Sequence, residues 1–236
     1  MAVFHDIYNN LIVKNDLSCY LDKVESFYIL YKALIRANNN LNLTAIDTPE
    51  SIIIRHFIDC LKIVSYIPQG SYLLDVGCGG GFPSLPVAIV RKDVSIVSLD
   101  ATAKKLGFVD DMSSILNLEN ITTITGRAEL LSRTGVYRNQ FDVVVSRAVA
   151  RLNILSELCM PFLKTNGIFI SMKAASAIEE IDEAQLGIKI LGGNIISRDK
   201  FLLSDGSIRE NIIIKKITDT PDKYPRSFSK IKKMPL

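Results

Sequence analysis

The stretch DVGCGGGFPS, residues 75–84, decides the fold of this chain. Four of its ten residues are glycine, an acid precedes them, and apolar runs lie on either side. Glycine allows a sharp turn and lets a ligand lie against the backbone. The stretch therefore predicts a bare turn between a strand and a helix. Such a turn holds phosphates, holds an adenine nucleoside, or only connects the two elements.

Strands alternate with helices on the C-terminal side of this stretch. The helical stretches are residues 83–91, 103–117 and 151–163, and the strand-like runs are SYLLDV (71–76), VSIVSLD (94–100), ITTIT (121–125), FDVVVS (141–146) and GIFISMK (167–173). This alternation predicts βαβ units and a parallel sheet covered on both faces. Two further strand-like runs flank Ser204-Asp205-Gly206-Ser207, which favours a hairpin. The predicted class is α/β: a doubly wound, mostly parallel, Rossmann-like sheet with an antiparallel C-terminal hairpin.

The first quarter of the chain is predicted to be helical. Apolar residues recur at helical spacing over residues 17–38, and Asn38-Asn39-Asn40 is expected to end that helix. Thr48-Pro49-Glu50 is typical of a helix start, and the helix that follows is expected to run to about Tyr66. We therefore expect three parts: an N-terminal helical cap over residues 1–68, the main α/β domain over 69–218, and a basic tail over 219–236.

Composition and charge are those of an ordinary globular protein. Of the 236 residues, 48% are hydrophobic and 22% are charged, and the net charge is +3. The charge is uneven, because residues 215–236 contain seven basic and two acidic side chains. A basic tail on a near-neutral body suits a polyanionic partner, and it equally suits a solvated tail that aids solubility.

Cysteines and histidines are too few and too scattered to predict a metal site. The four cysteines form no C-x-x-C pair and there are only two histidines, so we expect no zinc and no other metal. The N-terminus lacks the features of a signal peptide, and no apolar run approaches membrane-spanning length. We expect a reduced, cytoplasmic protein without a membrane partner, and nothing in the sequence demands more than a monomer.

The spacing of the glycines indicates which nucleoside the turn would hold. Asp100 ends the second predicted strand, where an acid accepts hydrogen bonds from the ribose hydroxyls of an adenine nucleoside. The dinucleotide fingerprint needs glycine at the position of Phe82, and no Gly-Lys-Ser/Thr follows, so NAD is disfavoured and a P-loop is excluded. The G-x-G-x-G pattern that begins at Gly77 is typical of S-adenosylmethionine-dependent methyltransferases. Asp75 either helps to place the positive amino acid end of that cofactor or only orients the loop.

Short motifs follow one another in order along most of the chain. They are Asn42-Leu43-Thr44-Ala45-Ile46, Arg55-His56-Phe57-Ile58-Asp59, residues 75–83, Lys104-Lys105, Gly126-Arg127-Ala128-Glu129, Ser146-Arg147-Ala148-Val149-Ala150, Thr220-Pro221-x-Lys223-Tyr224-Pro225-Arg226 and Lys233-x-Pro235-Leu236. Each motif is weak alone, but together they are specific. The chain resembles the bacterial small-subunit (16S) ribosomal RNA guanine-N7 methyltransferases, also called the glucose-inhibited division protein B family. The resemblance implies transfer of a methyl group from S-adenosylmethionine to N7 of one guanine in an RNA loop.

The resemblance also implies a cofactor site, residue by residue. The implied cofactor-binding residues are Asp75, Gly77, Gly79, Phe82, Asp100, Ala101, Thr102, Ala128, Glu129 and Arg147. Two positions depart from the family pattern. Ser84 and Ala174 stand where the family usually has glycine, at the start of the helix and at the end of the fifth strand. Serine should be tolerated in a first helical turn, whereas alanine resists a positive φ.

The expected chemistry needs no acid or base. Guanine N7 is an acceptor without a hydrogen, so the enzyme must mainly hold the nucleophile, the methyl carbon and sulfur in line. Arg147 and Lys173, at the ends of the fourth and fifth strands, are our catalytic candidates, because cationic side chains can orient guanine through O6 and N7. Either residue could instead form a salt bridge or bind a phosphate.

The expected partner is small-subunit ribosomal RNA, alone or in the ribosomal subunit. N7 lies in the deep, narrow major groove of an RNA helix, so the target should be a loop nucleotide or a flipped one. The terminal lysines are candidates for holding the RNA, together with Arg55, His56, Lys104, Lys105, Arg127 and Arg226. His56 could also be an ordinary packed histidine. Two other functions stay open: a methyltransferase of another acceptor, and a noncatalytic RNA-binding or assembly protein with a vestigial pocket.

Overall fold

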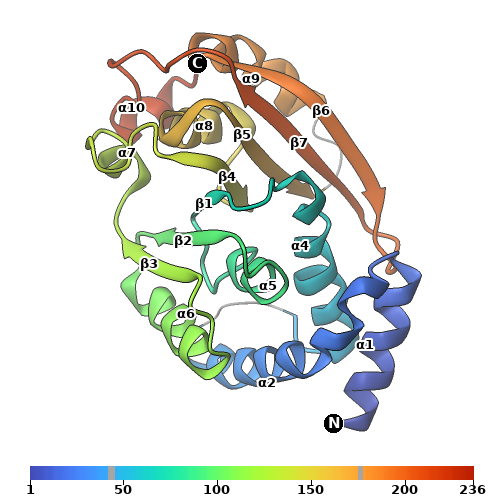
Figure 1. The fold of residues 1–236 in the computed structure, drawn as a ribbon. Coiled ribbons are helices and arrows are strands. Elements are labelled where there is room, and N and C mark those ends of the chain that lie inside the picture. Colours follow the sequence, from blue (N-terminus) through green and yellow to red (C-terminus); the bar gives the residue numbers. More distant parts are fainter. Residues whose placement is uncertain (42–45, 175–177) are drawn as a thin grey trace.

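A single twisted sheet organises the molecule. The computed structural model describes residues 1–41, 46–174 and 178–236, so all but the last residue of the motif at 42–46 lies outside the described residues. Within these ranges, seven strands form one sheet in the order β3-β2-β1-β4-β5-β7-β6 (Figure 1). They are β1 (Tyr72–Val76), β2 (Ser95–Asp100), β3 (Ile121–Thr125), β4 (Phe141–Arg147), β5 (Leu163–Ala174), β6 (Gly193–Leu202) and β7 (Ile208–Lys216). The first five pair in parallel, and β7 pairs antiparallel with β5 and β6, which confirms the predicted class and the C-terminal hairpin.

Helices cover both faces of the sheet and close two hydrophobic cores. One core lies under α1 (Ala2–Lys14), α2 (Val24–Leu41), α5 (Ser84–Val90) and α6 (Ala103–Ile115). The other lies under α7 (Ala128–Leu131), α8 (Leu152–Cys159), α9 (Ile178–Ile190) and α10 (Phe228–Lys233). The central strands serve both cores: Val143 is buried in the first and its neighbour Val144 in the second. This two-sided burial explains why the strands read as continuous apolar runs.

Helix α2 is longer than the sequence indicates. We expected Asn38-Asn39-Asn40 to end it, and that prediction is wrong, because the helix continues to Leu41. Asparagine in a helix is less favourable than alanine by less than about 1 kcal/mol per residue. The buried side chains of Phe27, Leu30 and Leu34 pack the helix onto the core, and such packing outweighs weak propensities.

The second predicted helix begins where expected and changes its pitch along the way. The Thr48 hydroxyl accepts a hydrogen bond from the Ser51 amide at 3.3 Å, and Pro49 is the first helical residue. The chain then passes through α3 (Pro49–Ile52), the π-helical segment η2 (Ile53–Ile58) and α4 (Asp59–Leu61), followed by the short 3₁₀ helix η3 (Val64–Tyr66). π-Helical turns are frequent at functional sites, and this one carries the predicted site residues Arg55 and His56.

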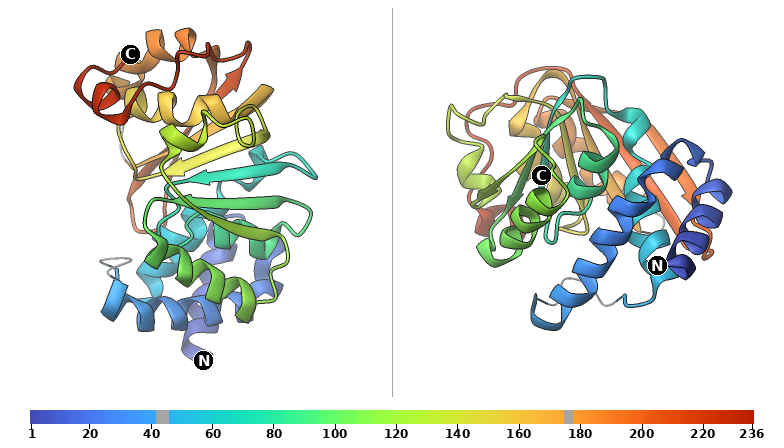
Figure 2. Two further views of the ribbon diagram at one scale, coloured as in Figure 1. Left: turned by 90° about the vertical axis from the view of Figure 1, so that its left-hand side faces the viewer. Right: turned by 60° about the horizontal axis from the view of Figure 1, so that its bottom comes forward.

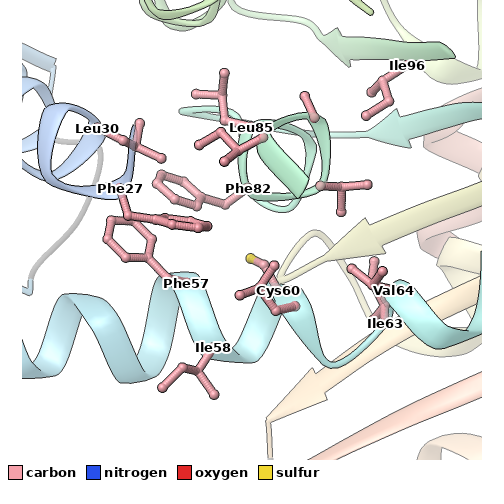
Figure 3. Packing of buried hydrophobic residues seen from close by; sticks show 14 of the residues in the cluster. Phe27, Leu30, Phe57, Ile58, Cys60, Ile63, Val64, Phe82, Leu85 and Ile96 are labelled. Atoms are coloured by element: carbon pink, nitrogen blue, oxygen red, sulfur yellow. The ribbon is translucent and has the colours of Figure 1, made fainter. Parts of the chain in front are cut away.

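An aromatic cluster joins the glycine-rich stretch to the N-terminal helices. Figure 3 shows the rings of Phe27, Phe57 and Phe82 gathered between α2, the helix of residues 49–61 and α5. The ring centroids of Phe27 and Phe57 are 4.9 Å apart, and those of Phe57 and Phe82 are 6.4 Å apart. The glycine-rich stretch is therefore held by packing as well as by its own turn.

The basic tail folds back onto the domain. Figures 1 and 2 show α10 beside α7 and α8, at the opposite end of the molecule from α1. Arg226 donates to Glu157, whose side chain is completely buried, with a shortest N–O distance of 2.6 Å. Arg138 donates to the carbonyl groups of Thr220 at 2.6 Å and Tyr224 at 2.9 Å. Residues 219–236 thus have a fixed place on the second core.

One lysine that we counted with the basic tail adds no charge to the surface. Lys216 is the last residue of β7 and is completely buried. Its ammonium group donates to Asn139 Oδ1 at 2.6 Å and to the carbonyl groups of Leu163 at 2.6 Å and Met160 at 3.2 Å. Burial lowers the pKa of Lys216 to about 8. The count of basic residues over 215–236 therefore overstated the surface charge of this end of the chain.

Candidate active site

A cavity of about 1000 Å³ opens where the parallel strands end. Its lining follows β1, β2, β3, β4 and β5 in turn, so it lies outside the carboxyl ends of the strands, where open α/β sheets bind their ligands. The predicted site residues that line it are Arg55, His56, Gly77, Gly79, Phe82, Asp100, Ala101, Lys105, Arg127, Ala128, Glu129, Arg147 and Lys173. Asp75, Thr102, Lys104 and Arg226 do not belong to this lining.

The glycine turn and Asp100 form one end of the cavity. Gly77 takes a φ of +74°, which favours glycine, and its amide donates to the carbonyl group of Leu99 on the neighbouring strand at 2.8 Å. The Asp100 carboxylate accepts the amide of Gly79 at 3.0 Å and the amide of Thr102 at 2.8 Å. Each carboxylate oxygen can accept a further hydrogen bond, so Asp100 can take up ribose hydroxyls while it still supports the turn.

Asp75 lies beneath the turn. Its Oδ2 accepts the amide of Ser84 at 3.1 Å and the hydroxyl of Ser84 at 2.5 Å, while its Oδ1 is buried without a hydrogen-bond partner among the described residues. Ser84 is thus well accommodated in the first turn of α5. The other departure from the family pattern, Ala174, ends β5 as extended strand paired with Arg209. The role of Asp75 toward the cofactor stays a prediction.

The buried Asp75 predicts a pH dependence of stability. Burial raises the pKa of Asp75 from 3.8 to about 6, although the hydrogen bonds from Ser84 oppose the shift. The folded state then holds its proton more tightly than the unfolded state, so the free energy of unfolding falls as the pH rises from about 4 to 6. We expect a loss of about 3 kcal/mol over this range relative to Asp75→Asn. Urea unfolding of both proteins between pH 4 and 7 measures it, and parallel curves would contradict the shift.

Arg147 connects the end of β4 to the helix of residues 49–61. Its guanidinium group donates to the carbonyl group of Arg55 at 3.0 Å, to Asp59 Oδ2 at 3.3 Å and to His56 Nδ1 at 3.1 Å. It also lies over the ring of Phe82, 5.5 Å from the centroid. A guanidinium group has five N–H donors. Among the described contacts, Arg147 therefore keeps donors that a bound base can use.

His56 is neutral and has a defined tautomer. Burial and the neighbouring Arg147 lower its pKa to about 3. Because a guanidinium group only donates, Nδ1 must be the acceptor and the ring proton lies on Nε2. The ring also packs on Phe82, with centroids 4.9 Å apart. His56 is thus a packed residue that also lines the cavity, and its contact with RNA stays a prediction.

The remaining cationic candidates differ in how they are held. Arg127 pairs with Glu129 at 2.5 Å and lies over the ring of Phe228, 4.9 Å from its centroid, which links the cavity wall to α10. Arg55 pairs with Asp205 at the tip of the β6–β7 hairpin at 2.6 Å. Lys105 lines the cavity, and its side chain forms no hydrogen bond or ion pair among the described residues. These positions place several positive charges around the opening.

Four charged residues that line the cavity, Asp59, Arg151, Glu180 and Arg209, were not among the predicted site residues. Asp59 is 5% exposed and contacts Arg147 and Arg209, the latter at 3.6 Å. Burial raises the pKa of Asp59, and the two guanidinium groups oppose that shift. Glu180 pairs with Lys173 at 2.7 Å. Of these residues, Asp59 could have been found from the sequence, because it ends the motif that begins at Arg55. Arg209 and Glu180 reach the site only through contacts between distant parts of the chain.

The described ranges contain neither a cluster of metal ligands nor a membrane-spanning helix. No group of three or more His, Cys, Asp or Glu side chains there is arranged to hold a metal ion. No helix in those ranges combines the length and the apolar character that crossing a membrane requires.

Solved structures with the same architecture include M. jannaschii TYW2 in complex with AdoMet. It has a TM-score of 0.54 and 14% identity, and the match covers 69% of this chain and 76% of that one. The cyclase SpnF has a TM-score of 0.52 and 14% identity, covering 68% of this chain and 82% of that one. At these identities the likeness shows the fold alone, and it confirms the class that the alternating pattern predicts.

Sequence comparisons define the family. A family model described as GidB, rRNA small subunit methyltransferase G, matches residues 23–202. Ribosomal RNA small subunit methyltransferase G of Clostridium tetani is 40% identical over 99% of both chains. The protein of that name from Clostridium botulinum (strain Loch Maree) is 44% identical over 94% of this chain and 95% of its own. The resemblance carried by the short motifs is confirmed, and the chain belongs to the rRNA small subunit methyltransferase G family.

Proposed function

We propose that this protein transfers a methyl group from S-adenosylmethionine to N7 of one guanine in a loop of small-subunit (16S) ribosomal RNA. One observation carries the proposal. One cavity is lined both by the glycine turn with Asp100 and by Arg147, His56 and Phe82. The first set suits an adenine nucleoside and the second suits a flat base with acceptor atoms on its edge. Family membership makes ribosomal RNA the source of that base.

The cavity fits the methyl donor in size and in chemistry. Its volume of about 1000 Å³ is ample for a nucleoside with an amino acid arm. A β-carbon at Gly79 would meet nothing within 4 Å, so the backbone of the turn is open to a ligand. Asp100 would hold the ribose, and Ala101, Ala128 and Glu129 would surround the adenine. The bound cofactor supplies a methyl group on a positively charged sulfur.

Arg147, His56 and Phe82 orient the acceptor. Arg147 donates to O6 of the guanine through the N–H groups that its protein partners leave available, which keeps the N7 lone pair free, and the ring of Phe82 limits the movement of Arg147. With the cofactor bound, the N7 lone pair would form the bond to the methyl carbon, and the electron pair of the broken carbon–sulfur bond would return to sulfur. No proton leaves guanine, so no general base is required. Catalysis then rests on alignment and on exclusion of water.

The target RNA must present its guanine outside a regular helix. N7 is out of reach in the deep major groove of A-form RNA, so a loop or a flipped nucleotide is the substrate. We propose that Arg55, His56, Lys104, Lys105 and Arg127 hold the surrounding RNA. The protein would act as a monomer in the cytoplasm, where ribosomal subunits are assembled.

The direct test is methyl transfer from labelled S-adenosylmethionine. Small ribosomal subunits from cells that lack the enzyme are incubated with the purified protein, and the RNA is digested and separated. Label in 7-methylguanosine at a single position of 16S RNA is expected. Cofactor binding without transfer to RNA would favour another acceptor, and absence of cofactor binding by calorimetry would favour a noncatalytic RNA-binding protein.

Helix α10 should contribute to RNA affinity. Lys230, Lys232 and Lys233 are exposed on it, and none forms an ion pair among the described residues. Arg127, stacked on Phe228, connects this helix to the cavity. The triple Lys→Gln variant should reduce the slope of log affinity against log salt by about 2, since each phosphate contact on single-stranded RNA adds about 0.7. Lys14, Lys92 and Lys200, which are exposed and do not line the cavity, provide the matched triple control. An equal slope in both variants would remove α10 from the RNA-binding surface.

A further inference from the structure

The loop between β4 and α8, residues 148–151, forms a wall of the cavity in a strained conformation. Ala148 has a φ of +58°, a left-handed conformation that a residue with a β-carbon rarely adopts. Such a conformation persists only where the surrounding structure holds it, and it is frequent at functional sites. All four residues of the loop line the cavity. The contacts that hold the loop therefore shape the site.

Lys173 and Glu180 supply those contacts. The ammonium group of Lys173 donates to the carbonyl group of Ala150 at 2.8 Å and to Glu180 Oε2 at 2.7 Å. The same Glu180 oxygen accepts the amide of Leu152 at 2.8 Å. The Lys173–Glu180 ion pair thus binds the backbone on both sides of residue 151. It also connects the end of β5 and the start of α9 to this loop. The Lys173 side chain is 11% exposed, so these contacts occupy most of its surroundings.

Val149 is the side chain that this arrangement presents to the cavity. It is 42% exposed although it is apolar, and a β-carbon at Gly77 would lie 2.5 Å from its Cγ2. Val149 therefore stands against the turn that would hold the cofactor, and it follows Arg147 by two residues. Val149 thus lines the cavity next to both the glycine turn and the strand end that carries Arg147.

We propose that Lys173 is a positioning residue: together with Glu180 it holds residues 148–151, so that Val149 offers an apolar surface against which the target guanine lies. This inference rests on the proposed function, and it gives Lys173 an indirect role in place of the direct contact with guanine that its position at a strand end suggested. An apolar surface at this place accepts the flat face of a base, so that Arg147 can donate to O6 while N7 stays free for the methyl group.

The test compares Lys173→Met with Glu180→Gln. If Lys173 acts through the loop, both variants lower kcat for RNA methylation by a similar factor, on the order of 10 to 100, and the double variant is no worse than the more severe single variant. Val149→Ala should lower kcat/KM for RNA in the same direction. The affinity for S-adenosylmethionine, measured by calorimetry, should change by less than about threefold in each. Glu179→Gln, an exposed neighbour on α9 that does not line the cavity, is the matched control and should methylate like the wild type.

A second readout does not depend on RNA. Hydrogen exchange of the amides at residues 149–152 should accelerate in both Lys173→Met and Glu180→Gln and stay unchanged in Glu179→Gln. A severe loss in Lys173→Met beside normal activity and normal exchange in Glu180→Gln would show that Lys173 contacts the substrate directly and would overturn the inference. If wild-type protein methylates no small-subunit RNA, the proposed function fails, and the exchange data still decide whether the ion pair holds the loop.

Discussion

The Arg226→Ala variant will unfold at a temperature about 6–20 °C below that of the wild type. Glu157 is completely buried, and Arg226 is the side chain that neutralises it, through Nε at 3.0 Å and a terminal nitrogen at 2.6 Å. Without the Arg226 side chain, the described part of the chain offers the buried carboxylate one hydrogen bond, from the backbone amide of residue 226 at 2.7 Å. Breaking such a pair is destabilising by about 3–5 kcal/mol, and each kcal/mol shifts Tm by about 2–4 °C in a chain of this size.

Two control variants test whether the lost ion pair causes this decrease in Tm. Lys233→Ala removes an exposed positive charge from the same tail and should leave Tm within about 1 °C, as exposed substitutions usually do. Combining Arg226→Ala with Glu157→Gln removes the uncompensated charge and should restore part of the stability. Scanning calorimetry of the variants measures the shifts. A Tm for Arg226→Ala within 2 °C of the wild type would mean that the pair does not hold the tail.

Replacing Asp100 by alanine will weaken S-adenosylmethionine binding by about 5- to 150-fold, or about 1–3 kcal/mol, through the loss of hydrogen bonds to a charged group. The effect has two sources. The carboxylate would no longer accept ribose hydroxyls, and the amides of Gly79 and Thr102 would lose the oxygen atoms that orient them. Isothermal titration calorimetry measures the dissociation constant.

The matched control for this variant is Asp111→Ala. Asp111 is an exposed acid on α6 that does not line the cavity, so its loss should leave the affinity unchanged. Asp100→Asn retains one acceptor oxygen and should fall between the two. Wild-type affinity in Asp100→Ala would mean that the ribose lies elsewhere in the cavity.

The sheet could be predicted because its causes are local. The strands are determined by apolar runs bounded by turn residues, and the hairpin by Asp205-Gly206 at its tip. Each of these signals spans only a few neighbouring residues. The turn at Gly77 and the acid at Asp100 belong to adjacent strands of one βαβ unit, so the sequence also placed them together. The asparagines at 38–40 were a poor predictor of the end of α2, because the local preference of asparagine against a helix is weak.

The charged pairs of the site could not be predicted in the same way. Lys173 and Glu180 meet only when α9 packs beside β5, and Asp59 meets Arg209 only when the hairpin reaches the N-terminal helices. A sequence gives the charge of each residue without its burial. Lys216 and Arg226 look like two members of one basic tail, yet one lies in the core and the other forms an ion pair with a buried acid.

The return of the C-terminal tail onto the second core has a consequence during synthesis of the chain. Tyr224 and Ile231 are buried in that core beside residues of α8 and α9. A nascent chain that ends after β7 has all its strands but exposes the apolar surface that these two side chains cover. Incomplete chains of this kind are prone to aggregate or to bind chaperones. Premature stop codons downstream of β7 should therefore yield insoluble or rapidly degraded protein, although every strand and every residue of the cavity has already been translated.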